Sequence, residues 1–499
     1  MTSYSFLRAA FSVIFAVTYV FANDTLSFPQ GFLLGTATSA YQIEGGWNIN
    51  GKGESVWDRW THDNPNLILD HSNGDVACDS YHKYKEDVQL LKDMEVDFYR
   101  FSVSWTRILP TGYPNVINQD GINYYKNLIN ELLANNIEPF ITLYHWDHPE
   151  YLDKMGGWTN SLMVEWISNY ARVVFKELGP KVKYFTTINE PADVCQGVAT
   201  DKVAPGKNLG SPGKYLCMHN ILKAHAKIYH IYQTEFRKQQ KGQVGIVISC
   251  PGAFPKTPND TAAVDAIFQF VCGWVAHPIF SKTGDYPEII KAHIADNSKL
   301  DGYPASLLPT FSPKWVQYIK GSADFFGLNH YTSKLVETVP RVEGERWYDY
   351  SGVKQTIDPS WPKSAADWLR VVPDGLRQVI NLISKQYDRP PIFVMENGFA
   401  DECCTSDSSR ISYLRSYMKA MLSAIYEDGC NVKSYTAWSL LDNFEWADGY
   451  KVRFGLVNVD FTNPNRTRTP KLSMNWYKTV IKTRRIDSIF ESPDVVNIP

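Results

Sequence analysis

Eight short strand-like runs recur along this chain, and each ends in polar or aromatic residues. They occupy residues 32–40, 98–105, 138–146, 184–190, 244–250, 325–331, 391–396 and 434–441. Between them apolar residues recur every three or four positions, as in helices that pack on a core, most clearly over 121–136 and 410–427. Strands that alternate with helices favour a parallel sheet. Eight of them predict an α/β fold, a single (β/α)8 TIM barrel with its active site at the C-terminal ends of the strands.

An open, doubly wound sheet shows a similar alternation and is the alternative architecture. Such a sheet more often carries a glycine-rich phosphate-binding turn after its first strand, and this chain has none there. The 499 residues contain no obvious linker, so we predict one barrel domain over residues 23–499. We expect the longest irregular region, residues 337–363, to form an elaborated loop over the barrel mouth.

The first 22 residues differ in character from the rest of the chain. After Arg8 the run 9–22 is almost entirely apolar, and it ends in Val20-Phe21-Ala22 at the usual cleavage spacing. It is too short to span a bilayer comfortably, so residues 1–22 are predicted to be a signal peptide. A buried N-terminal helix is the alternative, although the segment has almost no polar face. The C-terminus carries no retention signal, and we therefore predict secretion.

Glycosylation sequons and cysteines agree with an extracellular address. The sequons begin at Asn23, Asn259 and Asn465, each in a polar, turn-like setting. Eight cysteines are spread along the chain without CxxC spacing, which argues against a zinc cluster. Pairs among them can form disulfides in an oxidising compartment, but their connectivity is not readable from the sequence.

The overall charge limits the classes of partner. The net charge is −3 and the isoelectric point is near 6.4, whereas binding to nucleic acid or to anionic membranes needs a basic face. After the N-terminal segment, no stretch reaches the ~18 uninterrupted apolar residues of a spanning helix. We therefore predict a small-molecule substrate, no nucleic-acid partner and no membrane partner. The oligomeric state is not predictable.

Two glutamates end predicted strands on opposite sides of the barrel. Glu190 ends the fourth run and Glu396 ends the seventh. Strands four and seven of a closed eight-stranded barrel face each other across its mouth, so the two carboxylates can converge on one substrate. Glycoside hydrolysis needs such a pair, one to protonate the leaving oxygen and one to attack the anomeric carbon. By itself this pattern leaves a surface carboxylate or a helix cap open for either residue.

Longer motifs at the strand ends narrow the interpretation. With them the chain resembles glycoside hydrolase family 1, which contains β-glucosidases and lactase-like enzymes, over roughly residues 26–486. The motifs are the run 32–45, which includes Gln42; the run 99–105, which includes Arg100; Leu143-Tyr144-His145-Trp146-Asp147; Asn189-Glu190-Pro191; Glu396-Asn397-Gly398; and the run 438–446. Six motifs in the family's order, each at the end of a predicted barrel strand, carry the resemblance.

The resemblance implies a retaining mechanism. Glu190 matches the family's general acid/base and Glu396 its nucleophile. A retaining pair holds its carboxyl groups ~5–5.5 Å apart. Arg100 matches an arginine that keeps the nucleophile ionised, and Tyr331 matches a tyrosine that donates to it. Since Glu190 must begin protonated, we expect burial and the charge of Glu396 to raise its pKa.

The resemblance also implies a sugar-binding set and the absence of a cofactor or a metal. The positions that match hydroxyl-binding residues, together with the aromatic floor Trp438, are Gln42, His145, Asn189, Tyr331, Trp438, Glu445 and Trp446. Glu445 implies an unphosphorylated sugar, because members that act on phosphorylated sugars replace this acid. Two departures from the family are Met395, where threonine is usual, and residues 192–196, which lack a bulky aromatic that many relatives have on the leaving-group side.

Three functional interpretations follow. The first is a secreted β-glucosidase. The second is a thioglucosidase (myrosinase) that keeps both glutamates, for which Arg341 and Arg346 are candidate contacts to an anionic aglycone, unless they are ordinary solvated charges. The third is a non-catalytic, Klotho-like binding module, which is disfavoured because such proteins lose one or both glutamates. Asp147 and Asp442 are interpreted as structural hydrogen-bonding residues.

Overall fold

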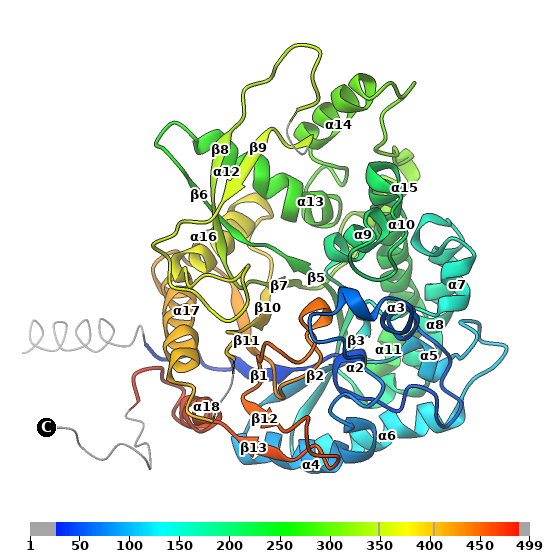
Figure 1. The fold of residues 1–499 in the computed structure, drawn as a ribbon, viewed down its shortest axis with the longest axis vertical. Coiled ribbons are helices and arrows are strands. Elements are labelled where there is room, and N and C mark those ends of the chain that lie inside the picture. The colour runs from blue at the N-terminus through cyan, green and yellow to red at the C-terminus, as the bar shows by residue number, and fades with distance from the viewer. Residues whose placement is uncertain (1–25, 348–349, 403–404, 489–499) are drawn as a thin grey trace, which may run out of the picture.

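The computed structural model describes residues 26–347, 350–402 and 405–488 (Figure 1). The predicted signal peptide and Asn23 lie outside this part of the chain. Eight parallel strands close into a barrel in which each strand pairs with the next and β1 pairs with the last. They are β1 (Leu33–Ala37), β2 (Phe98–Ser102), β3 (Glu138–Tyr144), β4 (Tyr184–Asn189), β5 (Gln243–Ser249), β7 (Phe326–Asn329), β10 (Ile392–Asn397) and β11 (Val432–Trp438). All eight predicted strands are confirmed, and with them the (β/α)8 barrel.

The barrel is filled by side chains rather than hollow. Phe140 on β3 and Phe393 on β10 belong to strands that are not neighbours in the sheet, yet their ring centroids are 6.3 Å apart. They belong to a buried cluster with Phe98, Val247, Phe325 and Met395. The strands are buried along almost their whole length, which is why they read as apolar runs rather than as alternating ones.

Helices surround the barrel, and the longer ones follow its strands (Figure 1). The longer helices are α3 (Val56–Asp63), α4 (Ser80–Met94), α6 (Gln119–Ala134), α8 (Met163–Glu177), α9 (Pro191–Ala199), α10 (Gly210–Ile231), α12 (Thr261–Phe268), α14 (Glu288–Leu300), α16 (Pro373–Gln386), α17 (Ser408–Tyr426) and α18 (Leu472–Thr483). Shorter ones are α2 (Ala40–Ile43), α5 (Trp105–Ile108), α7 (Glu150–Lys154), α11 (Arg237–Gln240), α13 (Trp274–Phe280) and α15 (Pro313–Ile319). In the described chain one helical segment, Thr261–Phe280, is long and apolar enough to cross a membrane, and 61% of it is buried inside the protein.

The region 337–363 is not wholly irregular, so that prediction was wrong. It contains the end of β8 (Ser333–Thr338) and all of β9 (Val353–Thr356), which pair as an antiparallel hairpin. β6 (Gly252–Pro255) adds to β8 in parallel and completes a three-stranded sheet. A further two-stranded sheet joins β12 (Val457–Val459) to β13 (Arg468–Pro470).

Two disulfides link segments near the barrel mouth. Cys195 of α9 is bonded to Cys217 of α10, and Cys250, which follows β5, is bonded to Cys272 between α12 and α13. Cys78 and Cys430 are free and buried, while Cys403 and Cys404 lie outside the described residues. The cysteines therefore include two pairs of equal spacing, each 22 residues apart.

The two predicted structural aspartates differ in their surroundings. Asp442 accepts from Lys471 Nζ at 2.8 Å and from the Gly455 amide at 3.0 Å, which confirms a structural role. Asp147 is 2% exposed, and its Oδ1 has no hydrogen-bond partner within the described residues. Burial raises the pKa of Asp147 to about 7, and the nearby Glu44 adds to this shift.

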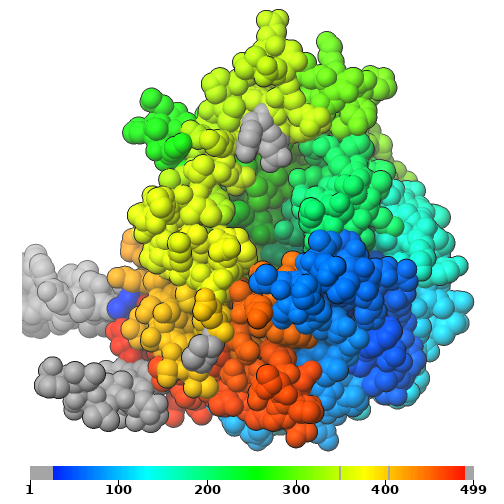
Figure 2. Space-filling view, in the orientation of Figure 1, coloured from blue at the N-terminus to red at the C-terminus, as the bar shows by residue number. Residues whose placement is uncertain are grey.

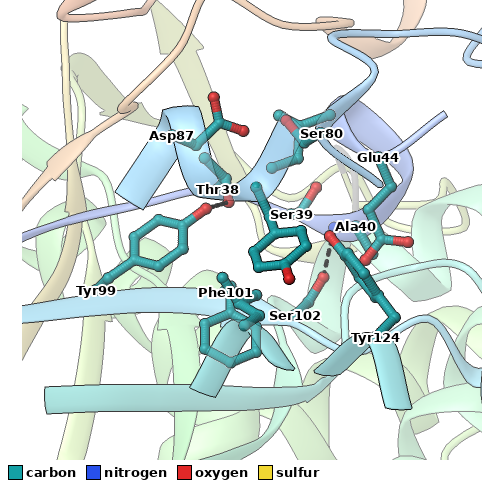
Figure 3. A pocket seen from close by; sticks show the side chains of 13 residues that line it. Thr38, Ser39, Ala40, Glu44, Ser80, Asp87, Tyr99, Phe101, Ser102 and Tyr124 are labelled. Carbon is teal, nitrogen blue, oxygen red and sulfur yellow. Dashed lines mark hydrogen bonds between the residues drawn. The ribbon is translucent and has the colours of Figure 1, made fainter. Parts of the chain in front are cut away.

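A small enclosed cavity lies behind β1 and β2 (Figure 3). Thr38 and Tyr99 share a hydrogen bond of 2.5 Å at its edge, and the Ala40 amide donates to Ser102 Oγ at 2.7 Å. Its volume of about 10 Å³ matches a single water molecule rather than a substrate. The functional site is therefore to be found elsewhere.

Candidate active site

A large cavity lies at the C-terminal end of the barrel and has a volume of about 540 Å³. The surface is hollowed near the centre of the face in Figure 2, between segments coloured yellow, green, blue and orange. Residues that follow six different barrel strands line the cavity, as is usual for active sites of this fold. Those among them that the sequence predicted are His145, Glu190, Tyr331, Glu396, Trp438, Glu445 and Trp446.

Two donors contact the carboxyl group of Glu396. Arg100 Nη1 lies 2.6 Å from its Oε1, and the Tyr331 hydroxyl donates to its Oε2 at 2.8 Å. Burial, together with the charge of Glu396, raises the pKa of Tyr331 well above its usual value, so the phenol keeps the proton that it donates. Glu396 itself is only 4% exposed, near the end of β10. A charge buried this deeply needs such partners.

Glu190 has the same side chain in a different environment. Its Oε1 accepts from Asn329 Nδ2 at 2.9 Å and its Oε2 accepts from Asn189 Nδ2 at 3.4 Å, so its direct partners are neutral amides. Burial raises the pKa of Glu190 well above its ordinary value, and the charge of Glu396 raises it further. The expectation of a raised pKa is therefore confirmed.

A short chain of hydrogen bonds connects the two glutamates. Arg100 binds Glu396 through Nη1 and donates through Nη2 to Asn189 Oδ1 at 2.6 Å, while the amide nitrogen of Asn189 faces Glu190. Arg100 and Asn189 are both fully buried behind the cavity wall, and Thr142 Oγ1 accepts from Arg100 Nε at 2.9 Å. The two glutamates are thus held in place from below by residues of strands β2, β3, β4 and β10. The expected carboxyl separation of ~5–5.5 Å stays a prediction.

The predicted sugar-binding residues gather around one side of the cavity. The His145 ring lies nearly parallel to those of Trp438 and Trp446, with centroids 5.9 and 6.0 Å away. Burial lowers the pKa of His145 well below its usual value, so the ring is neutral. Asn189 Nδ2 lies 3.2 Å from His145 Nε2. This wall offers aromatic faces beside hydrogen-bonding groups, which suits the apolar faces and the hydroxyls of a sugar.

Gln42 is fully buried behind this wall and contacts the cavity residue Glu445. Its amide nitrogen lies 3.5 Å from Glu445 Oε2 and donates more closely to Asn443 and to the Phe444 carbonyl. Burial raises the pKa of Glu445 well above its usual value, with Asp448 and Glu396 adding to the shift.

The structure adds residues that the sequence analysis missed. Asn329 donates to Glu190, Trp368 lines the cavity with 41% of its surface exposed, and Asp193 lies on the wall just after Glu190. Asn329 lies near the end of the predicted strand 325–331 and ends the observed β7, so a polar residue close to a strand end was the signal available for it. Met395 is fully buried in the barrel core, so the missing threonine hydroxyl leaves an apolar floor under Glu396.

Arg341 and Arg346 do not reach this site. Arg341 pairs with Asp296 and Arg346 with Asp301, so both tie the β8–β9 connection to α14 and to the turn that follows it. Neither lines the cavity. Their interpretation as contacts to an anionic aglycone is therefore unsupported.

A buried pair of glutamates in a cavity with aromatic walls, at the C-terminal end of a (β/α)8 barrel, defines a glycoside hydrolase. Comparison with known proteins then identifies the family. The model described as "Glycosyl hydrolase family 1" matches residues 24–486, and the chain belongs to this family.

Similar proteins include both O- and S-glycosidases. The chain is 45% identical to "Myrosinase 1" of Brevicoryne brassicae, over 91% of this chain and 98% of that one. The solved structure titled "Aphid myrosinase" has a TM-score of 0.88 at 44% identity, covering 92% and 100% of the two chains. A β-glucosidase from the fungus Humicola insolens, solved in complex with glucose, has a TM-score of 0.84 at 38% identity, covering 92% and 99%. This chain is thus a retaining β-glycosidase by family.

Proposed function

We propose that this protein is a secreted β-glucosidase that removes the non-reducing β-glucosyl group of small glycosides, with Glu396 as nucleophile and Glu190 as acid/base. The observation that carries the proposal is the contrast between the two carboxyl groups. Glu396 is ion-paired with Arg100, whereas Glu190 meets only neutral amides and has a raised pKa. One is therefore suited to attack and the other to give a proton.

In the first step Glu396 attacks the anomeric carbon while the bond to the leaving oxygen breaks. Glu190 donates its proton to that oxygen, so the aglycone departs as a neutral alcohol. Arg100 and Tyr331 hold the carboxylate of Glu396 in one orientation before the attack. The product of this step is a glucosyl ester of Glu396.

The second step reverses the roles. Once Glu396 is esterified its negative charge is gone, and a charge that raised the pKa of Glu190 disappears with it. Glu190 is now ionised and takes a proton from a water molecule that attacks the anomeric carbon. The ester bond to Glu396 breaks, and glucose leaves with its β configuration retained.

Glucose preference is supported by the wall around Glu445. A carboxylate next to Gln42 and above Trp438 can accept hydrogen bonds from two neighbouring sugar hydroxyls while the ring stacks on the indole. The fungal relative that was solved with glucose has a similar fold. One carboxylate that binds both O4 and O6 also tolerates galactose or fucose to some extent.

Secretion is supported by the N-terminal sequence, by the two disulfides and by two exposed sequons. Disulfides persist mainly in oxidising compartments. Asn259 and Asn465 both lie in exposed turns, where a glycan is sterically acceptable.

A thioglucosidase is the second candidate, because one of the most similar sequences and one of the most similar solved structures are named as myrosinases. The substrate of such an enzyme would place an anionic aglycone in the outer cavity. Lys334 lines that part of the cavity, whereas Arg341 and Arg346 do not. The two candidates share the roles of both glutamates and differ only in the leaving group.

The test compares p-nitrophenyl β-glucoside, cellobiose and a glucosinolate on the wild type and on Glu396→Gln. We expect hydrolysis of the O-glucosides and a loss of about 10⁴-fold or more in the variant. Glu288→Gln, at a side chain that is 89% exposed, is the matched control and should keep full activity. Hydrolysis of the glucosinolate alone would make the protein a thioglucosidase, and full activity of Glu396→Gln would overturn the proposed nucleophile.

A further inference from the structure

A second cavity adjoins the active site beside residues 192–196, which the family resemblance places on the leaving-group side. It has a volume of about 100 Å³ and shares Trp146 and Asp193 with the main cavity. We call it the side pocket; it is lined by Tyr144, Trp146, Asp193, Val194, Gln196, Val203, Ala204 and Pro205. The mechanism described above uses none of these side chains.

Asp193 stands at the junction of the two cavities. It lies in the first turn of α9, three residues after Glu190, and its side chain is exposed to the cleft. Within the described chain its carboxylate has no ion pair and no side-chain hydrogen bond. Desolvation within the cleft raises the pKa of Asp193 to about 6, with Lys214 opposing the shift and Glu396 adding to it. Near neutral pH the junction therefore carries a negative charge that no ion pair within the described residues neutralises.

The neighbouring cations do not enter the side pocket. Lys214 Nζ lies 5.6 Å from the ring centre of Trp274, and Lys214 does not line the side pocket. Lys334 lines the main cavity only, where its ammonium donates to the Trp368 carbonyl at 3.3 Å. A ligand group in the side pocket therefore meets the carboxylate of Asp193 first.

The other walls favour a small cation over a second sugar. Trp146 and Tyr144 offer aromatic rings, which attract an organic cation through their negative faces. Of the five remaining lining residues four are apolar, Val194, Val203, Ala204 and Pro205, so Gln196 is the one neutral amide among them that can bind sugar hydroxyls. Because a cavity of about 150 Å³ holds a benzene molecule, one of about 100 Å³ takes a smaller group, such as an alkylammonium head.

We propose that the side pocket is a leaving-group subsite for β-glucosides whose aglycone carries a small cationic nitrogen, with Asp193 as the residue that selects the charge. The inference rests on the proposed function, since it concerns the leaving group of the same reaction. It also implies discrimination against anionic aglycones at this wall of the cleft. Asp193 acts on binding; its charge also adds to the raised pKa of Glu190, an effect that both members of a matched substrate pair share.

The test uses pairs of substrates that differ in charge and hardly in shape. One pair is 2-ammonioethyl β-glucoside and propyl β-glucoside. A longer pair is 4-(ammoniomethyl)benzyl β-glucoside and 4-ethylbenzyl β-glucoside. We expect the ratio of kcat/KM, cation over neutral, to fall about tenfold from wild type to Asp193→Asn for at least one pair. Asp193→Glu should retain most of the preference.

Two further variants distinguish the effect of the Asp193 charge from the effect of the pocket volume and from a general effect of removing a surface charge. Asp201→Asn makes the same charge change at an exposed site outside both cavities and should leave the ratio unchanged. Val203→Phe fills the side pocket and should lower kcat/KM for both members of the affected pair, but not for methyl β-glucoside.

The outcomes are distinct from those of the proposed function. If no β-glucoside is hydrolysed by the wild type, the proposed function itself fails. If p-nitrophenyl β-glucoside is hydrolysed and both ratios are the same in wild type and Asp193→Asn, the inference is wrong. Preference for a sulfonate-bearing analogue would also overturn it and assign the charge selection to Lys334.

Discussion

Glu190 and Glu396 show how surroundings give one kind of side chain two chemistries. Each is almost fully buried, and the electrostatic cost of that burial is met in opposite ways. Glu396 accepts hydrogen bonds from the Arg100 guanidinium and the Tyr331 hydroxyl, and these partners favour its charged form. Glu190 accepts hydrogen bonds from two amide side chains, so its neutral acid form is the more stable one.

Replacing Glu190 by glutamine should affect substrates according to their leaving group. Departure of an alcohol needs the proton of Glu190, so kcat/KM on cellobiose should fall about 10²–10⁴-fold. 2,4-Dinitrophenolate leaves without a proton, so the first step on 2,4-dinitrophenyl β-glucoside should be far less affected. Added azide should then restore turnover and give β-glucosyl azide. An equal loss on both substrates would contradict the assignment.

The raised pKa of Glu190 also predicts the alkaline side of the pH profile. The working form is the protonated acid, and it is lost as the pH rises through that pKa. Therefore kcat/KM should decline on the alkaline side, at a pH well above the ordinary range of a glutamic acid. In Glu190→Gln this decline should be absent, which stopped-flow measurement of the first step can check. A decline that persists unchanged would point to another group.

The sequence predicted the site residues that lie in family motifs. It did not predict the residues whose role depends only on where the fold places them. Asn329 donates to Glu190. One sequence does not show whether an amide near a strand end contacts a catalytic acid or points into solvent. Asp193 was noted only as part of a stretch without a bulky aromatic. Its unpaired state depends on where Lys214 and Lys334 point, which only the folded structure fixes.

At the scale of elements, the barrel strands were predictable because burial on both faces makes them continuous apolar runs. The hairpin of β8 and β9 was not, because its strands are short and carry exposed charges such as Glu337 and Lys354. The helix predicted over residues 410–427 begins two residues earlier, as α17 (Ser408–Tyr426). The residue before α17 is Asp407, whose carboxylate binds Arg410 and the Ser473 amide. Ser408 and Ser409 already belong to the helix.

The start of α18 contains an ion pair whose loss should destabilise the protein. Lys471 and Asp442 are both fully buried, 2.8 Å apart. Lys471→Met would leave the Asp442 charge with the Gly455 amide and a longer contact to Arg453, and we expect a loss of about 3–5 kcal/mol in unfolding free energy. Arg59→Met is the control, since Arg59 and Asp63 form an exposed pair, and should change little. Urea unfolding of both variants checks this, and equal midpoints would contradict it.

At the scale of the whole molecule, loops from both halves of the chain form one cleft. The two disulfides fasten elements on the same side of it, α9 to α10 and the end of β5 to the turn before α13. The segment after Glu190 is thereby tied to the long helix behind it. The family motifs made the barrel and the glutamate pair predictable, whereas the side pocket depends on loops whose course one sequence does not reveal.

Export makes a prediction for the intact protein. When the full chain is expressed in eukaryotic cells, we expect it in the medium with Asn23 as its first residue. Peptide:N-glycosidase treatment should reduce its mass, and Asn259→Gln and Asn465→Gln should each remove one glycan because both sites are exposed. Intact-mass spectrometry and N-terminal sequencing give the answer. Retention in the cytosol with an intact N-terminus would contradict the proposed address.

The most direct test of the central claim is to trap the glycosyl-enzyme. 2,4-Dinitrophenyl 2-deoxy-2-fluoro-β-glucoside slows both steps but keeps a good leaving group, so the covalent intermediate accumulates. Peptide mass spectrometry should then find one fluoroglucosyl group, on Glu396, and inactivation should parallel its appearance. A label on any other residue, or continued turnover without a label, would contradict the assignment of Glu396 as the nucleophile.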